Sequence, residues 1–160
     1  MNILGIDPGL TQTGYGIIQV TGTQTTMVDY GIIKPNAKES LPQRLITIFN
    51  DVAEIIEKYT PSVMAIEDIF YGKNIRSTLM LGHARGAALL AAAQQKIPIY
   101  EYSPRKVNQA LTGNGNAHKQ QVQFMVKSVL QLADIPQPQD ASDALALCLC
   151  HTQQFRQGDI

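Results

Sequence analysis

Four acidic residues stand where secondary-structure elements are expected to begin or end, and together they could bind metal ions. They are Asp7, Glu67, Asp140 and Asp143. Two of them close short apolar runs typical of strands, and the other two open a helical pattern. Gathered carboxylates repel each other, by about 4 kcal/mol for a pair about 4 Å apart at an effective dielectric constant of about 20. Such a cluster therefore needs cations or bound protons.

Alternation along the strands selects Glu67, and not Asp68, as the partner of Asp7. Successive side chains of a strand point to opposite faces, so Asp7 shares a face with Gly5, and Glu67 shares a face with Ala65. Each of these two acids thus ends an apolar strand beside a small residue.

Asp140 and Asp143 are three positions apart in a helical pattern, which places them on one face. That face continues through apolar residues such as Ala144 and Leu147. A helix that packs this face on the sheet would carry its two acids to the strand ends where the other two project.

Oxygen ligands on separate rigid elements suit Mg²⁺, and Mn²⁺ should substitute for it. Two such ions about 3.5–4 Å apart can activate water and stabilise the leaving oxygen of a phosphodiester. Each acid also has an ordinary explanation as a turn residue, a satisfied strand-end acid, a helix N-cap or a partner of the helix dipole. Their joint placement on converging faces favours metal binding.

The composition indicates a folded cytoplasmic protein. With 160 residues and 44% hydrophobic residues, the chain fits one domain, residues 1–160, with disorder expected at most near the C-terminus. The start of the chain lacks a signal-peptide pattern, and the longest run of small apolar residues, 86–93, is too short to span a bilayer. Cys148 and Cys150 are expected to be buried, unpaired thiols in a reducing compartment.

Charge is unevenly distributed along the chain, although the net charge is zero. Residues 69–133 hold eight cations and one anion, whereas the remainder holds five cations and twelve anions. A segment this basic could follow a phosphate backbone. An ordinary solvated face explains it equally well.

The periodicity of apolar residues predicts an α/β fold in which helices flank a mixed five-stranded sheet. Strands are expected at 1–7, 15–20, 26–33, 63–67 and 97–102, and helices at 41–59, 75–94, 104–111, 117–132 and 138–155. Three consecutive strands form a meander, and the later strands alternate with helices, which makes the sheet mixed.

Several motifs resemble, in order and at fitting distances, the RuvC family of Holliday junction resolvases. The motifs are residues 5–9 with 13–16, 66–70 with 73–74, 81–86, 112–115, Lys119 with 121–122, and 140–146. The resemblance covers nearly the whole chain. It implies an RNase H-like fold, and a homodimer that resolves four-way junction DNA during recombination and repair by paired, Mg²⁺-dependent nicks with ligatable ends. It also implies a partnership with the RuvA–RuvB branch-migration complex.

The resemblance also assigns roles to individual residues. The family's four metal-binding carboxylates, which are expected to hold two ions, match Asp7, Glu67, Asp140 and Asp143. Phe70 matches the aromatic residue that probes bases near the crossover. Lys119 matches a basic residue near the scissile phosphate. Further DNA contacts are expected from Lys73, Arg76, Arg105 and Lys106. The family commonly has a lysine where this chain has Asn108, so one basic contact is in question.

Other features leave alternatives open. The turn at 112–116 could hold a phosphate with backbone amides or be an ordinary glycine-rich turn. Phe70 and Tyr71 could each stack on an unpaired base or cap the core. For Phe70 we favour stacking, and for Tyr71 neither alternative is preferred. The motif at 7–9 with Gly14 is also similar to the phosphate loop of actin-like ATPases, which need a second domain and an adenosine site. A junction-binding module without catalysis would not need four converging acids.

Overall fold

The chain folds around a five-stranded sheet of mixed direction. The computed structural model describes residues 1–69 and 72–158. The strands are β1 (Asn2–Asp7), β2 (Thr13–Thr21), β3 (Gln24–Ile33), β4 (Val63–Glu67) and β5 (Ile99–Tyr102). Their order is β3-β2-β1-β4-β5, with β1, β4 and β5 parallel to one another and β2 antiparallel to both of its neighbours. The predicted mixed sheet is confirmed.

Five helices complete the described part of the chain, and most begin at a recognisable cap. They are α1 (Leu41–Tyr59), α2 (Ile75–Gln94), α3 (Pro104–Thr112), α4 (Lys119–Val129) and α5 (Gln139–Gly158). The hydroxyl of Ser103 accepts a hydrogen bond from the backbone N–H of Lys106 at 3.2 Å, which satisfies a free donor in the first turn of α3. The predicted limits of α1, β4 and α2 are confirmed to the residue.

The largest difference from the expected elements concerns α4, which is shorter at both ends than the predicted helix at 117–132. The backbone N–H of His118 donates to the side-chain oxygen of Gln121 at 3.1 Å, so the helix is capped at His118. At the other end, Gln131 has a φ of 54°, a left-handed conformation that ends the helix. The final helix reaches Gly158. Disorder was expected among the last few residues, of which 159–160 lie outside the described residues.

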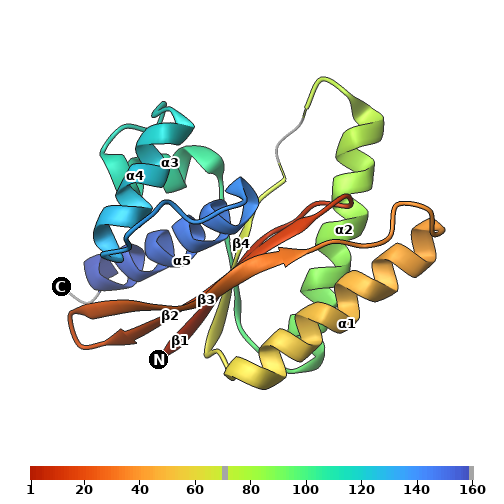
Figure 1. Ribbon diagram of the computed structural model, residues 1–160, viewed down its shortest axis with the longest axis horizontal. Helices are drawn as coiled ribbons and strands as arrows, with labels where there is room; N and C mark the ends of the chain where they lie inside the picture. Colours follow the sequence, from red (N-terminus) through yellow and green to blue (C-terminus); the bar gives the residue numbers. More distant parts are fainter. Residues whose placement is uncertain (70–71, 159–160) are drawn as a thin grey trace.

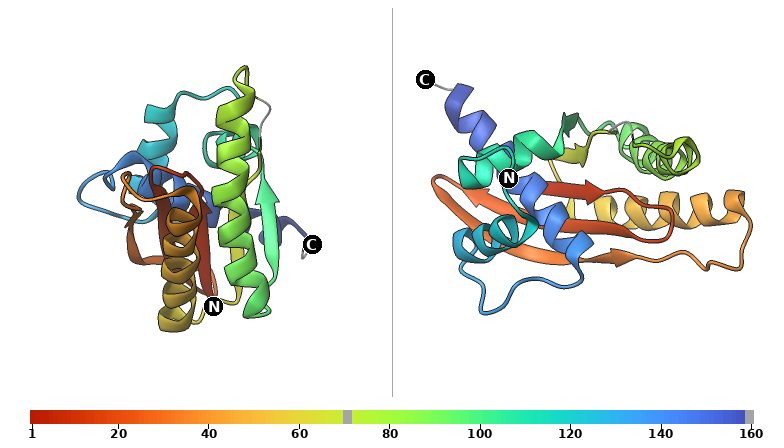
Figure 2. Two further views of the ribbon diagram at one scale, coloured as in Figure 1. Left: turned by 90° about the vertical axis from the view of Figure 1, so that its right-hand side faces the viewer. Right: turned by 90° about the horizontal axis from the view of Figure 1, so that it is seen from above.

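The helices cover the two faces of the sheet unequally, as Figures 1 and 2 show. On one face, α1 and α2 pack against the sheet side chains Leu4, Ile6, Met64 and Ile66. On the other face, α3, α4 and α5 pack against Ile3, Val63, Ala65 and Tyr102. The alternation expected for β1 and β4 is therefore present, and Asp7 and Glu67 end these strands on the α5 side.

Helix α5 lies unusually close to the sheet because glycines face it. A Cβ atom on Gly5 would overlap the carbonyl oxygen of Ala144, and one on Gly14 would overlap the carbonyl oxygen of Asp140. Backbone therefore touches backbone at these two points. The close approach fixes the first turn of α5 against the ends of β1 and β2.

The cysteines of α5 are buried and unpaired, as predicted. The thiol of Cys148 lies 3.5 Å from the carbonyl oxygen of Gly16, and burial raises the pKa of Cys150 to about 11. Both thiols are thus protonated packing groups, Cys148 between α5 and the sheet and Cys150 between α5 and α3. Within residues 1–69 and 72–158, no helix combines the length and the apolar character needed to cross a bilayer.

Candidate active site

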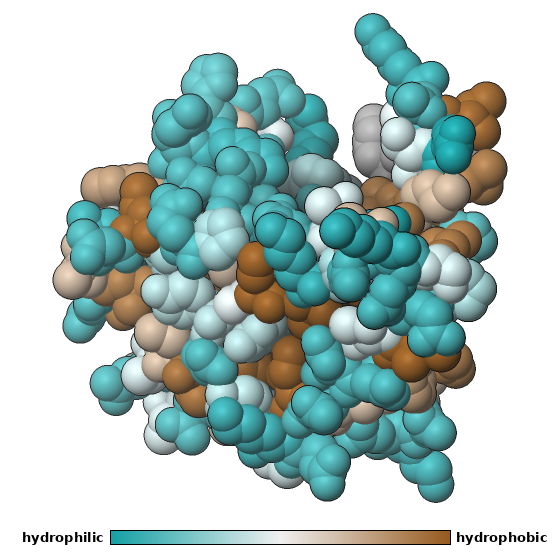
Figure 3. All heavy atoms as spheres, turned by 45° about the vertical axis from the view of Figure 1, so that its right-hand side comes forward, coloured by the Kyte–Doolittle hydropathy of each residue, from teal (hydrophilic) through white to brown (hydrophobic). Residues whose placement is uncertain are grey.

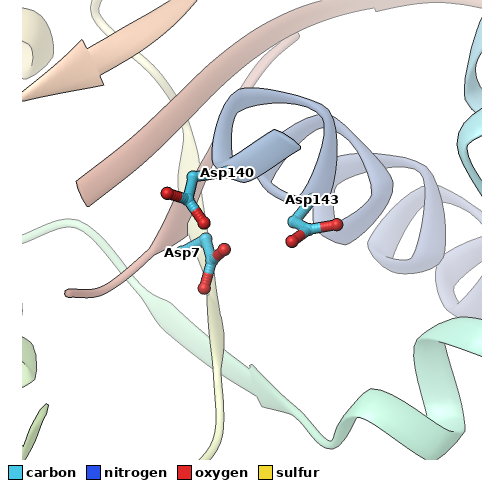
Figure 4. A group of neighbouring side chains, drawn as sticks. All are labelled: Asp7, Asp140 and Asp143. Carbon is cyan, nitrogen blue, oxygen red and sulfur yellow. The ribbon is translucent and has the colours of Figure 1, made fainter. Parts of the chain in front are cut away.

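Three aspartates converge at one end of the sheet (Figure 4). Asp7 comes from the end of β1, Asp140 from the first turn of α5, and Asp143 from the turn that follows it. One carboxylate oxygen from each of the three lies within 4.8 Å of the other two. Because Asp7 and Asp140 are 133 positions apart in the sequence, the tertiary fold creates the cluster.

Glu67 joins the cluster through Asp7. The strands β1 and β4 run parallel with Ile6 opposite Ile66, so the next residue on each strand is an acid. The carboxyl groups of Asp7 and Glu67 form a hydrogen bond. Asp68 is exposed and turns away, 3.9 Å from the guanidinium of Arg85. The structure thus brings the four predicted acids together and leaves Asp68 out.

Burial and mutual repulsion raise the pKa values of the carboxyl groups in the cluster. Asp7 is 9% exposed, and burial, followed by the neighbouring Glu67 carboxyl, raises its pKa far above the ordinary value. Burial likewise raises the pKa of Glu67, with the Asp143 carboxylate acting in the same direction. Without a cation, the Asp7–Glu67 pair therefore retains a proton at neutral pH.

This donor set fits a divalent cation. The ligand atoms are carboxylate oxygens on separate strands and a helix, held by backbone packing, which is the ligand type that Mg²⁺ and Mn²⁺ prefer. A bound cation would also supply the positive charge that the buried acids lack. Of the four predicted metal ligands, Asp7, Asp140 and Asp143 lie close enough together to share one cation.

Lys119 adds a positive charge at the edge of the cluster. It begins α4, and its ammonium lies 3.1 Å from Oδ2 of Asp143. Burial lowers the pKa of Lys119, but the carboxylates of Asp143, Asp7 and Glu67 together raise it by more, so the net pKa is above the ordinary value. The ammonium is thus charged and, at 66% side-chain exposure, accessible to a phosphate.

A recess of about 180 Å³ opens beside the acids, lined in part by Glu67, Lys119 and Asp143. Asn108, which stands where the family commonly has a lysine, lies in its wall. The amide of Asn108 donates a hydrogen bond to the carbonyl oxygen of Gly115 at 3.2 Å. This residue therefore supports the turn before α4 and leaves Lys119 as the cation that lines the recess.

Two residues that the sequence did not single out as part of the site contact the acids or their strands. Gln12 donates a hydrogen bond from its side-chain amide to Oδ2 of Asp140. Arg85 donates from Nε to the backbone carbonyl of Glu67 at 3.2 Å, and its terminal nitrogen lies 3.0 Å from Glu101. The spacing of residues along the sequence predicts neither contact, because each one joins two segments that are not neighbours in the chain.

The other predicted DNA-binding residues lie outside this cluster. Lys73 and Arg76 are exposed near the start of α2. Arg105 is exposed on α3 and donates to the side-chain oxygen of Asn116 at 3.0 Å, while the ammonium of Lys106 lies 5.8 Å from the centre of the Tyr102 ring. The predicted roles of Phe70 and Tyr71 fall outside the described residues.

Helix α2 also exposes apolar side chains. Ile75 is 76% exposed and Leu79 is 62% exposed. Figure 3 shows apolar surface at the protruding end of the molecule, where α2 begins, beside a largely hydrophilic surround. An exposed apolar patch of this kind is typical of a surface that contacts a macromolecule.

Comparison with known proteins gives one consistent result. The family model described as crossover junction endodeoxyribonuclease RuvC matches residues 3–151. A protein of that name from Desulforamulus reducens is 48% identical over 153 residues, which cover 96% of this chain and 94% of the relative. Another, from Halothermothrix orenii, is 46% identical over 98% of this chain and 94% of the relative.

A solved structure agrees with the sequence comparison. The structure described as Thermus thermophilus RuvC in complex with Holliday junction substrate superposes with a TM-score of 0.94 at 34% identity, over 99% of this chain and 96% of that one. This likeness confirms the predicted RNase H-like arrangement of the mixed sheet and its helices.

Proposed function

The chain belongs to the RuvC family of crossover junction endodeoxyribonucleases, and we propose that it resolves Holliday junctions by paired, metal-dependent nicks during recombination and repair. The observation that carries the chemistry is the convergence of Asp7, Asp140 and Asp143, with Glu67 bonded to Asp7. Family membership supports the four-way junction as substrate. The carboxylates support hydrolysis of a phosphodiester bond.

In this proposal the four acids hold two Mg²⁺ ions, for which Mn²⁺ can substitute. When bound, the ions would activate a water molecule and stabilise the leaving oxygen. Asp7 and Glu67 would have to give up the proton that they retain without a cation, since a ligand carboxylate must be deprotonated. Lys119 would contact the phosphate from the open side of the cluster, where its ammonium is exposed.

DNA binding would rest on cations away from the acids. Lys73 just before α2, Arg76 on α2, and Arg105 and Lys106 on α3 are all exposed, as contacts with a phosphate backbone require. Phe70 would probe the bases at the crossover, as the resemblance implies. Junction affinity should therefore depend strongly on salt and little on the metal ligands.

The remaining parts of the proposal concern assembly. Paired nicks need two active sites on one junction, and each chain supplies one cluster, so we infer that the working unit is a homodimer of single-domain chains. The same reasoning by family supports work with the RuvA–RuvB complex in the cytoplasm.

A cleavage assay on a synthetic four-way junction tests the proposal. The unaltered protein should cut the junction with Mg²⁺, should not cut it with chelator, and should prefer it to linear duplex. Asp7→Asn should abolish cleavage and leave binding nearly intact. Asp68→Asn is the matched control, because this exposed acid faces away from the cluster, and it should cut normally.

Two outcomes would contradict the proposal. Cleavage by Asp7→Asn at the normal rate would contradict the proposed metal-dependent mechanism. Equal rates on junctions and linear duplexes would indicate a general nuclease, and binding without any cleavage would indicate a junction-binding module.

A further inference from the structure

Gln12 lies in the loop between β1 and β2, and its side-chain amide donates a hydrogen bond to Oδ2 of Asp140. We propose that Gln12 is a positioning residue for the metal site, which holds the Asp140 carboxylate in the orientation that places an oxygen beside Asp7 and Asp143. The inference rests on the proposed function, because it concerns the same carboxylates.

The loop that carries Gln12 is held at several points. The hydroxyl of Thr13 donates to the carbonyl oxygen of Gly9 at 2.8 Å and accepts from the Gly9 backbone N–H at 3.2 Å. The guanidinium of Arg44, from α1, donates to the carbonyl oxygen of Leu10 at 3.1 Å. A Cβ on Gly9 would overlap the carbonyl oxygen of Gln12, so the turn is tight. The backbone of Gln12 is therefore fixed before its side chain reaches the site.

The acceptor is fixed as well. Gly14 lies two residues beyond Gln12, and its Cα approaches the Asp140 backbone so closely that no Cβ would fit between them. The start of β2 and the first turn of α5 thus have a set separation. With both backbones fixed, the hydrogen bond from Gln12 restricts the rotation of the Asp140 side chain.

The three aspartates differ in the partner that each one meets. Asp7 bonds to Glu67, Asp143 bonds to the Lys119 ammonium, and Asp140 bonds to the Gln12 amide. An ammonium offsets the charge of its carboxylate, whereas an amide orients the carboxylate and leaves the charge intact. Gln12 therefore directs Asp140 without weakening it as a ligand for a cation.

Hydrogen-bond donors behind metal ligands affect affinity for the metal. Loss of such a partner typically costs about 10- to 100-fold in metal affinity or activity. Gln12 is half-buried and reaches Asp140 from outside the group of acids. We therefore expect its loss to weaken metal binding and to leave the fold and the junction affinity unchanged.

Calorimetric titration of the full chain with Mn²⁺ tests this role. Gln12→Ala and Gln12→Met should both bind Mn²⁺ about tenfold more weakly than the unaltered protein. Methionine keeps the length of the side chain and lacks the donor. Thr11→Ala, an exposed position in the same loop, is the control and should bind Mn²⁺ normally. Melting temperatures with chelator should match in all four proteins.

The outcomes separate donation from packing and from failure of the site itself. Normal Mn²⁺ affinity in Gln12→Met, with or without a loss in Gln12→Ala, would overturn the proposal. If the unaltered protein binds no Mn²⁺, the proposed metal centre fails together with this inference. If the unaltered protein binds Mn²⁺ and both Gln12 variants bind it with the same affinity as the unaltered protein, the inference alone fails.

Discussion

Helices α5 and α2 have the same length, 20 residues each, and cover opposite faces of the sheet, but they serve the site in different ways. Helix α5 carries two of the acids and rests backbone to backbone on Gly5 and Gly14. Helix α2 packs through small side chains such as Ala84 and Ala88 and reaches the site through Arg85. A backbone contact therefore positions a ligand with little tolerance, whereas a side-chain contact leaves room for adjustment.

Gly14→Ala should have the largest effect, because it forces apart the two backbones that position α5. The added methyl would meet the Asp140 carbonyl, which cannot rotate away. A displacement of about 1 Å at a catalytic site costs about 100-fold in rate, and overpacking costs about 1–3 kcal/mol of unfolding free energy. Junction cleavage and urea denaturation measure the two effects.

Gly16→Ala provides the graded control for that experiment. Its added methyl would lie 2.7 Å from the Cδ2 atom of Leu145, a side chain, and should cause a smaller loss than Gly14→Ala. Equal losses in the two variants would show that general crowding, and not the Asp140 contact, limits the position of α5.

The acids on the α5 side should make the metal-free protein less stable as pH rises. The pKa of Asp7 is raised on folding, so the folded chain holds its proton more tightly than the unfolded chain. This contribution is complete below the ordinary carboxyl pKa and is lost as pH approaches the raised value, at a rate of at most about 1.4 kcal/mol per pH unit for one proton.

Thermal denaturation with chelator between about pH 5 and about pH 9 tests this dependence. Asp7→Asn should flatten the profile, and Mg²⁺ should stabilise the unaltered protein more at the high end than at the low end. A profile in Asp7→Asn as steep as in the unaltered protein would assign the proton to another group.

Arg85→Lys should have an intermediate effect, since it weakens the one side chain through which α2 supports Glu67. A single ammonium cannot replace both the Nε contact to the Glu67 carbonyl and the contact to Glu101. We expect kcat to fall about tenfold with little change in KM, because the strand end shifts by less than in Gly14→Ala. Arg76→Lys keeps the positive charge at a proposed DNA contact on the same helix and should leave kcat unchanged, because Arg76 does not support the acids; a similar fall in kcat there would contradict a specific role for Arg85.

Gly86→Ala, on α2, should have the smallest effect and the opposite sign. No atom lies within 4 Å of the added methyl. Alanine in a helix is about 0.5–1 kcal/mol more favourable than glycine, so the unfolding free energy should rise by that amount while cleavage stays normal. Loss of cleavage together with a halved molecular mass would instead show that a second chain covers this face.

Residues whose placement follows a regular period could be predicted from the sequence. The two-residue period of a strand separated Glu67 from Asp68, and the helical period joined Asp140 to Asp143; the structure has both arrangements. The limits of α1 were predicted to the residue because its caps, Ser40 and Thr60, are next to the helix in the sequence. These features depend on neighbours in the chain.

Features that depend on distant contacts could not be predicted in this way. The bond from Gln12 joins it to a residue 128 positions away, and the bond from Arg85 ends on a backbone carbonyl, which every residue carries. The early end of α4 depends on the left-handed conformation of Gln131, which glutamine does not favour. Loop geometry and tertiary packing decide each of these.

The backbone contact between the first strands and α5 also means that the carboxylate cluster forms only after α5 has been synthesised and has packed on the sheet. A growing chain that has reached residue 138 already contains β1 and β4, with Asp7 and Glu67, but lacks the helix that supplies the other two acids. Its basic segment could already touch DNA, yet its carboxylate cluster would be half formed. A fragment that ends before α5 should therefore not cut a junction, because it lacks Asp140 and Asp143. Cleavage requires that α5 has packed on the sheet.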